Sequence, residues 1–154
     1  MLRELQVTMD KPANAMYKSG EEKIITGMAV VKNETNKTFE FPTEETASNL
    51  FFVDKERIPT GSNCARINMS DYDEDFVTVK ENEPAKLVAY YVGERFAVDQ
   101  FVEEGLESGV RVASVEGKLV KATVASRYIF KEFIVDNGHK LAVVEVADDA
   151  VVNA

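Results

Sequence analysis

The chain has 154 residues, of which 45% are hydrophobic and 29% charged, which is typical of one soluble globular domain. Its 27 acidic residues outnumber its 18 basic ones, for a formal net charge of −9. This balance argues against nonspecific binding to nucleic acid or anionic lipid, because both need clustered Lys and Arg. The single cysteine, Cys64, excludes an intrachain disulfide and favours a reducing compartment, where we expect an ordinary semi-buried thiol.

Residues 1–19 are predicted to form an extended arm or an edge strand. Residues 2–7 alternate only loosely between polar and apolar, and Pro12 has no backbone N–H to donate to a partner strand. Residues 1–9 lack a seven-residue apolar stretch, so we expect no signal peptide, and no window of the chain predicts a membrane-spanning helix. Such an arm can be held by its own domain or by a neighbouring subunit.

Residues 20–147 are predicted to form a single β domain. Strand signals recur about every 8 to 12 residues, which is the spacing of an all-β barrel or sandwich built from hairpins. The expected strands are 24–25, 28–31, 39–41, 50–53, 76–79, 87–91, 127–135 and 140–146.

Residues 24–53 and 106–146 are faintly similar, which predicts two related β units. Each contains a glycine before a strand (Gly27 and Gly109), a polar turn, a second strand and an Ala-Ser step into an aromatic strand. Chance similarity between short β patterns is the alternative.

Residues 94–104 are the best helix candidate. Val98, Phe101 and Val102 recur at helical spacing, and Gly105 could end the helix. An irregular excursion between strands is the alternative. The predicted fold is therefore mostly β, with at most one short helix.

The C-terminal region predicts a β-hairpin around Asn137-Gly138. This dipeptide favours a two-residue type I′ turn, in which both central residues need positive φ. The turn predicts three cross-strand pairs: Ile134 with Leu141, Phe133 with Ala142, and Phe130 with Glu145. Residues 148–154 are expected to form a short tail that frays.

An acidic loop at residues 71–75 is the closest approach to a metal site. Asp71, Asp73 and Asp75 imitate the opening of a calcium-binding loop. The sixth and twelfth positions hold Phe76 and Asn82 instead of Gly and Glu. A solvated acidic loop is therefore favoured, and weak calcium binding is the alternative.

Residues for catalysis are scarce. His139 is the only histidine, so there is no His pair for a metal and no convincing triad with Ser62 or Ser70. It follows the hairpin turn, where an exposed residue is expected. The paired carboxylates at 44–45 and 103–104 are interpreted as surface charge. We expect no catalytic, cofactor-binding or metal-binding residues and no enzyme activity.

Two aromatic pairs, at residues 51–52 and 90–91, could in principle stack on nucleic-acid bases. They lack the interleaved basic residues that single-strand binders use. We therefore expect both pairs in the core, and no nucleic-acid partner.

Two stretches resemble small structural proteins of tailed bacteriophages. The first is Asp54-Lys55-Glu56-Arg57-Ile58-Pro59-Thr60-Gly61, continuing to Tyr72, and the second runs from Gly117-Lys118-Leu119-Val120 through Asn137-Gly138 to Ala142. In such head-decoration proteins, a hairpin of this kind precedes a final strand pair. The resemblance rests on turns and strands, so it transfers no site residue.

The resemblance implies a noncatalytic virion protein, made in the host cytoplasm, that binds the major capsid protein on the outside of the head and stabilises it. It further implies a homo-oligomer without nucleic-acid or membrane partners, whose residues before Ser19 bridge subunits. Tail or head-completion proteins are alternatives, because they use comparable β modules. A small ligand-binding β-barrel and an oligomeric enzyme with carboxylates contributed across subunits also stay open.

Overall fold

The computed structural model describes residues 1–8, 16–55 and 77–154. The fold is mostly β-strand, which confirms the predicted fold class, and the described residues form no helix. The described part thus holds no helix able to cross a bilayer. Cys64, the acidic loop 71–75 and most of the first bacteriophage-like stretch lie outside the described residues.

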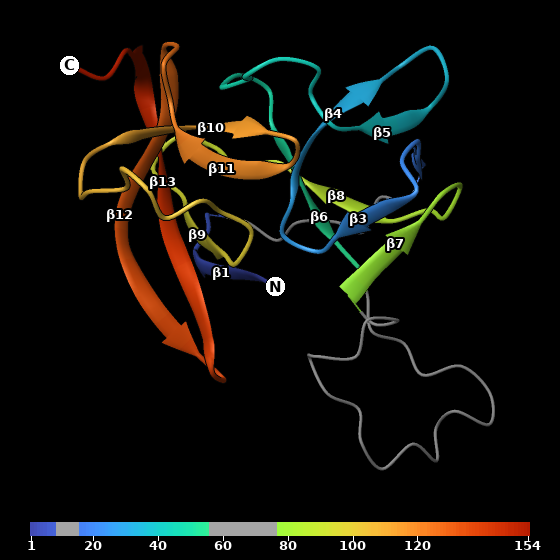
Figure 1. Cartoon of the computed structure of the whole chain (residues 1–154), viewed down its shortest axis with the longest axis horizontal. Helices are drawn as coiled ribbons and strands as arrows, with labels where there is room; N and C mark the ends of the chain where they lie inside the picture. The colour runs from blue at the N-terminus through green and yellow to red at the C-terminus, as the bar shows by residue number, and fades with distance from the viewer. Residues whose placement is uncertain (9–15, 56–76) are drawn as a thin grey trace.

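The larger sheet has six strands and curls like half of a barrel (Figure 1). All of its neighbouring strands are antiparallel. In spatial order the strands are β1 (Leu2–Gln6), β9 (Arg95–Val98), β13 (His139–Val151), β12 (Ser126–Asp136), β10 (Arg111–Val115) and β11 (Lys118–Lys121).

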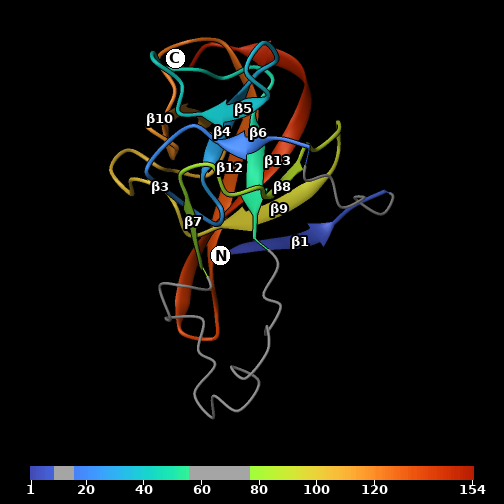
Figure 2. The same cartoon turned by 90° about the vertical axis from the view of Figure 1, so that its right-hand side faces the viewer.

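Two smaller sheets lie beside it. A five-stranded sheet has the order β2 (Lys18–Ser19), β5 (Thr38–Glu40), β4 (Ala29–Asn33), β6 (Phe51–Asp54) and β8 (Lys86–Val88), and its β2–β5 pair is parallel. A two-stranded sheet pairs β3 (Lys23–Ile25) with β7 (Thr78–Lys80). Figure 2 shows these shorter strands from the side.

One aromatic cluster joins the five-stranded sheet to the six-stranded sheet. Phe52 of β6 is fully buried, and its ring lies 4.5 Å from Phe96 of β9 and 6.2 Å from Tyr128 of β12, between centroids. Tyr90 stacks on Phe96 at 4.2 Å. Burying one such side chain stabilises the fold by about 1.5–3 kcal/mol, so this cluster fixes how the sheets pack.

A second buried cluster fills the space under the smaller sheets. Ile24, Val30, Phe39, Val53 and Val79 are all fully buried there. They come from β3, β4, β5, β6 and β7, so each short strand contributes one side chain to a shared interior. This burial explains how strands of three to five residues persist, since isolated two-stranded pairs are marginal in water.

The helix predicted at residues 94–104 is wrong. The segment contains β9, which pairs with β1 on one side and β13 on the other. Phe96, Ala97 and Val98 are all fully buried, so both faces of this strand are covered. A continuous apolar run is typical of such a strand, whereas a helix on the surface would show a stripe.

The predicted hairpin is confirmed at its turn. Asn137 and Gly138 have φ of 50° and 80°, and the pairs Ile134–Leu141 and Phe133–Ala142 form as expected. The third predicted pair is wrong, because Glu145 lies opposite Ile129 and Phe130 lies opposite Val144. The register shifts by one residue between Phe130 and Glu132, where Lys131 forms a bulge.

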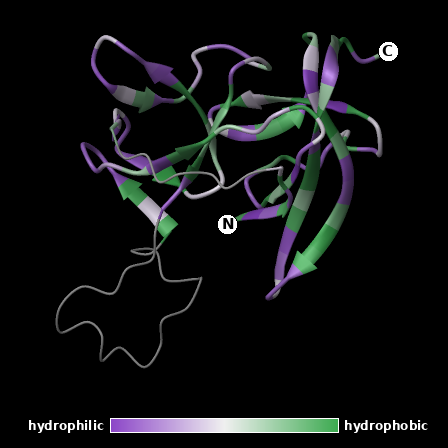
Figure 3. Cartoon of the chain, turned by 180° about the vertical axis from the view of Figure 1, so that it is seen from behind, coloured by the Kyte–Doolittle hydropathy of each residue, from purple (hydrophilic) through white to green (hydrophobic). Residues whose placement is uncertain are grey.

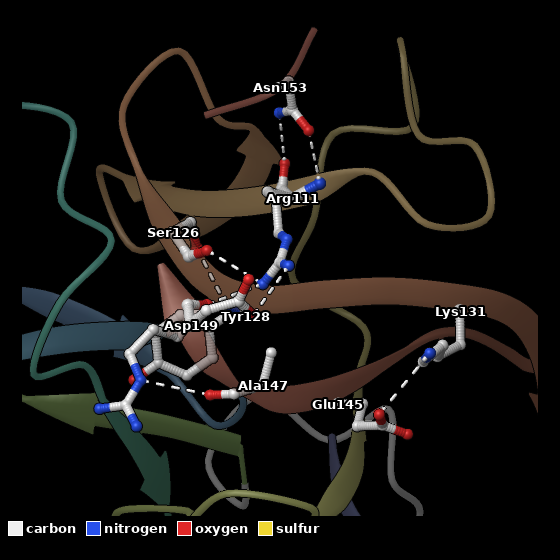
Figure 4. A network of polar contacts seen from close by, with 9 residues as sticks. Arg111, Ser126, Tyr128, Lys131, Glu145, Ala147, Asp149 and Asn153 are labelled. Atoms are coloured by element: carbon white, nitrogen blue, oxygen red, sulfur yellow. Dashed lines mark hydrogen bonds and ion pairs between the residues drawn. The ribbon is translucent and has the colours of Figure 1, made fainter. Parts of the chain in front are cut away.

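The expected fraying of residues 148–154 is also contradicted. Strand β13 continues to Val151, and Asn153 is held beyond it. The Asn153 side chain accepts the Arg111 N–H at 2.8 Å and donates to the Arg111 carbonyl oxygen at 2.9 Å (Figure 4). It also donates to the Ala122 carbonyl oxygen at 2.7 Å. The Arg111 guanidinium also contacts Asp149. These contacts fasten the end of the chain to β10.

Of the two predicted forms of the N-terminal arm, residues 2–6 adopt the edge strand. Met1 is 2% exposed and packs with Ala97, Leu141 and Val143. Its amino group lies 2.6 Å from Asp99 Oδ1. The first of the two expected attachments, to its own domain, is therefore present for this segment, and its removal would open the core. Its bridging role stays a prediction.

The two similar stretches share one strand connectivity. Residues 24–53 give the order β5-β4-β6, and residues 106–146 give β11-β10-β12, in both cases antiparallel. Gly27 and Gly109 precede β4 and β10 with φ of 95° and 92°. Whether the stretches are true repeats stays a prediction.

Candidate binding surfaces

A cleft of about 260 Å³ lies where the start of β6 meets β12 and β13. It is lined by residues 47–51, 89–92, 127–128 and Val146. Clefts that enclose small-molecule ligands are generally larger, roughly 300–1,000 Å³. This one, which we call the seam cleft, is of a size for one or two side chains.

The rim of the seam cleft is apolar and exposed. Tyr91 is 61% exposed and Val92 46% exposed. The expectation that residues 90–91 are both core is therefore wrong for Tyr91, whereas Tyr90 is 7% exposed and stacked on Phe96. An exposed tyrosine beside a cleft is typical of binding surfaces.

A hydrogen-bonded turn holds this rim in place. The Glu94 N–H donates to the Tyr91 carbonyl at 3.1 Å, and Gly93 has φ of 86°, as a type II turn needs. Buried Glu94 accepts the Tyr91 N–H on Oε1 at 3.0 Å. Gly93 and Glu94 also bond to the backbone of Val146 on β13. Tyr91 is thus presented from a fixed loop.

Arg127 is the charged side chain that lines the seam cleft. Its Nε donates to the carbonyl oxygen of Ala147 at 3.2 Å, which orients the guanidinium. Ser48 and Asn49 add a hydroxyl and an amide, and no carboxylate is among the lining residues of the described structure. On a chain of net charge −9, Arg127 is thus the one charged side chain among the described residues that line this cleft.

The inner walls of the seam cleft are two buried tyrosines. Burial raises the pKa of Tyr128, and a backbone hydrogen bond with Leu50 acts in the opposite direction. Burial also raises the pKa of Tyr90, with a further contribution from Glu4, whose Oε1 lies 3.4 Å from the hydroxyl. Both phenols therefore stay neutral at physiological pH.

A second surface is the end of the β12–β13 hairpin. Strand β9 pairs with β13 only from Ala142 to Glu145, so the hairpin extends beyond it (Figures 1 and 2). Figure 3 shows hydrophobic colour reaching the end of β12. Val135 there is 74% exposed, the highest value among large hydrophobic side chains in the described ranges. We call Val135, its cross-strand partner Lys140, and Phe133 with the Phe101 ring packed on it the hairpin tip.

The hairpin tip is ordered by contacts around Phe133. The Phe133 ring lies 5.4 Å from Phe101 and 4.7 Å from Phe130, between centroids. The Lys140 ammonium lies 4.2 Å above the Phe133 ring and 2.5 Å from Glu103 Oε1. The tip therefore combines the exposed Val135 side chain with an ordered aromatic ring, and its Lys140 is paired with Glu103.

A wider groove of about 630 Å³ is lined by β3, the residues that follow β5 and the β10–β11 turn. Ile25, Met28, Phe41 and Pro42 give it an apolar floor. Its rim carries both signs of charge, from residues such as Lys23 and Glu116, so it favours no particular partner chemistry.

The described residues considered for catalysis do not meet in one site, and Ser62 and Ser70 lie outside the described ranges. His139 was expected to be exposed, but its side chain is 15% exposed and its Nδ1 lies 3.8 Å from Asp99 Oδ2. Glu45 accepts the Thr123 N–H at 2.6 Å, and Glu103 pairs with Lys140. Within the described ranges, no three His, Cys, Asp or Glu side chains are placed to hold a metal ion.

No family model, curated protein or solved structure matches the chain. Its function is therefore argued from its own surfaces. Sequence reasoning missed the seam cleft, because its lining comes from four segments far apart in the chain. The available signal was Tyr91-Val92 before Gly93, an apolar pair next to a turn residue.

Proposed function

We propose that this chain is a noncatalytic structural protein of a bacteriophage virion that binds the outer surface of the head through its hairpin tip. The observation that supports this proposal most directly is the exposure of Val135. This side chain is 74% exposed at the end of a hairpin that extends beyond the neighbouring strand β9. Large exposed apolar side chains on an ordered support favour protein–protein contact. The resemblance to head-decoration proteins names the partner as the major capsid protein.

The proposed mechanism is stabilisation by linkage. A protein that binds only the assembled shell favours assembly, since opening the shell must also break its contacts. Many copies on one shell add avidity when the bound protein is a homo-oligomer. The net charge of −9 makes neighbouring copies repel one another, so it does not itself supply attraction between them.

The test uses purified heads that lack the chain, from the bacteriophage whose genome encodes it. Wild-type protein should cosediment with these heads, and Val135→Ser should bind at least about fivefold more weakly. Val115→Ser is the matched control, because Val115 is 39% exposed at the distant β10–β11 turn. It should bind like wild type.

Two results contradict the proposal. One is wild-type protein that stays in the supernatant with intact heads. The other is equal loss of binding in the Val135 and Val115 variants, which would mean that the tip has no special part.

A further inference from the structure

We infer that the seam cleft is a second binding site, which takes an extended peptide segment of a protein partner in which an apolar side chain is followed by a carboxylate. This inference does not depend on head binding, since the cleft and the hairpin tip share no residue.

The apolar half of the site is built from the rim and floor of the seam cleft. Tyr91 and Val92 are exposed at the rim, and Leu50, Tyr128 and Val146 are buried beneath them. A cleft of about 260 Å³ with these walls accepts one apolar side chain of a peptide. Tyrosine fits this role because it gives a large contact area with little loss of conformational entropy.

The charged half of the site is Arg127. Among the described residues, the Arg127 guanidinium donates a hydrogen bond through Nε to the Ala147 carbonyl oxygen. This bond does not use the two terminal nitrogens of the guanidinium. Two such nitrogens bind a carboxylate end-on, a geometry that a lysine cannot reproduce. No carboxylate in the described lining competes for Arg127, so a carboxylate from the partner is the complementary group.

The chemistry of the cleft selects a peptide over other ligands. Nucleic acid needs several cations along its backbone, whereas this cleft has one and the chain carries a net charge of −9. An enclosed small molecule needs more volume than the cleft has. Ser48 and Asn49 add polar groups that can bond to a peptide backbone.

The probe is a capped peptide, acetyl-Gly-Ser-Leu-Asp-Ser-Gly-amide, titrated into ¹⁵N-labelled full-length protein. The backbone amides of Tyr91, Val92 and Arg127 should shift, and that of Val135 should not. The matched peptide with Asn in place of Asp should bind about tenfold more weakly, because it lacks the charge for Arg127.

Three variants separate the halves of the site. Arg127→Gln should bind both peptides equally, and Arg127→Lys should restore only part of the preference for Asp. Tyr91→Ala should weaken both peptides by the same factor and keep the preference. Thermal unfolding of each variant checks that the fold is intact.

Equal affinity of wild-type protein for the two peptides would overturn the inference. So would the absence of amide shifts at about 5 mM peptide, since even a weak contact of this kind gives millimolar affinity. Tighter binding of a capped oligothymidine would assign the cleft to nucleic acid instead. Binding of the Arg127→Gln variant to heads separates the two proposals. This variant should lose the preference for the Asp peptide but bind heads as strongly as wild-type protein does.

Discussion

Two adjacent aromatic residues, Tyr90 and Tyr91, differ in role because one is buried in the core and the other is exposed to solvent. Phe52 is fully buried at the contact between the two larger sheets, and Tyr90 stacks in the same cluster. Tyr91, the next residue, is 61% exposed at the rim of the seam cleft. Aromatic character alone does not separate these positions, so sequence reasoning placed both tyrosines in the core.

Substitution of Phe52 and Tyr91 should therefore have different consequences. Phe52→Ala should lower the free energy of unfolding by about 3–5 kcal/mol, since it leaves a cavity between the sheets. Tyr91→Ala should change it by less than about 0.5 kcal/mol, as expected for an exposed side chain. Urea unfolding followed by circular dichroism measures both. Similar losses in the two variants would contradict the assigned burial.

The ionisation of Glu83 makes the stability of the fold depend on pH in the acid range. Burial raises its pKa, but the Lys80 N–H at 2.9 Å and the Lys55 ammonium at 2.9 Å outweigh this, and the net pKa lies below the ordinary value of 4.5. A carboxyl whose pKa is lower in the folded state stabilises the fold above its unfolded pKa and loses that effect as pH falls through the folded pKa.

Glu83→Gln should consequently be less stable than wild type at pH 7. The difference should shrink as the pH falls below 4.5, because wild-type Glu83 then becomes protonated. Urea unfolding at a series of pH values measures this. A difference that is constant with pH would show that Glu83 stabilises the fold without its charge.

At the scale of single elements, the features that depend on local sequence were predicted correctly, whereas those that depend on packing between distant strands were not. The Asn137-Gly138 turn is a two-residue signal, so the hairpin and its first pairs follow from sequence. The bulge at Lys131 has no such signal, and it moves Glu145 from Phe130 to Ile129. Such an extra residue depends on contacts with other strands, which the local sequence does not encode.

The other errors have the same cause. Residues 94–104 contain apolar residues at helical spacing, but β9 is fixed by its two neighbouring strands. The C-terminal residues looked like a polar tail until Asn153 found its partners on β10 and at Ala122. In both cases long-range pairing overrode the local pattern.

The turn at Gly93 gives a prediction for one element. Gly93 has φ of 86° and nothing lies within 4 Å of an added Cβ, so Gly93→Ala introduces backbone strain without a clash. It should cost about 1 kcal/mol and reduce peptide binding at the seam cleft. Gly109→Ala is the matched control, with φ of 92° and equally open space.

Gly109→Ala should lose similar stability and keep peptide binding, since Gly109 lies outside the seam cleft. Urea unfolding and the Tyr91 amide shift measure the two effects. Unchanged peptide binding in Gly93→Ala would contradict the fixed-rim description.

At the scale of the whole molecule, the mostly β fold was predictable, but the strand order was not. Strand signals and turns recur along the chain, and they indicate the class of fold. The pairing of β1 with β9 and the parallel pairing of β2 with β5 join segments far apart in sequence. The seam cleft depends on that order, and so it could not be foreseen.

The two proposed surfaces lie at opposite ends of strand β12. The hairpin tip lies at the turn end of β12, and the seam cleft includes Arg127 and Tyr128 at its start. Val135 lies seven positions after Tyr128 on this strand, roughly 23 Å away at 3.3 Å per residue. One copy can therefore contact a head shell and a second protein at once.

The central claim is that this chain stabilises a head shell by binding it. The most direct measurement is the temperature at which purified heads lacking the chain release their DNA, with and without added protein. Wild-type protein should raise that temperature, and Val135→Ser should raise it less than Val115→Ser at equal concentration. A release temperature that does not change at saturating wild-type protein would contradict the account.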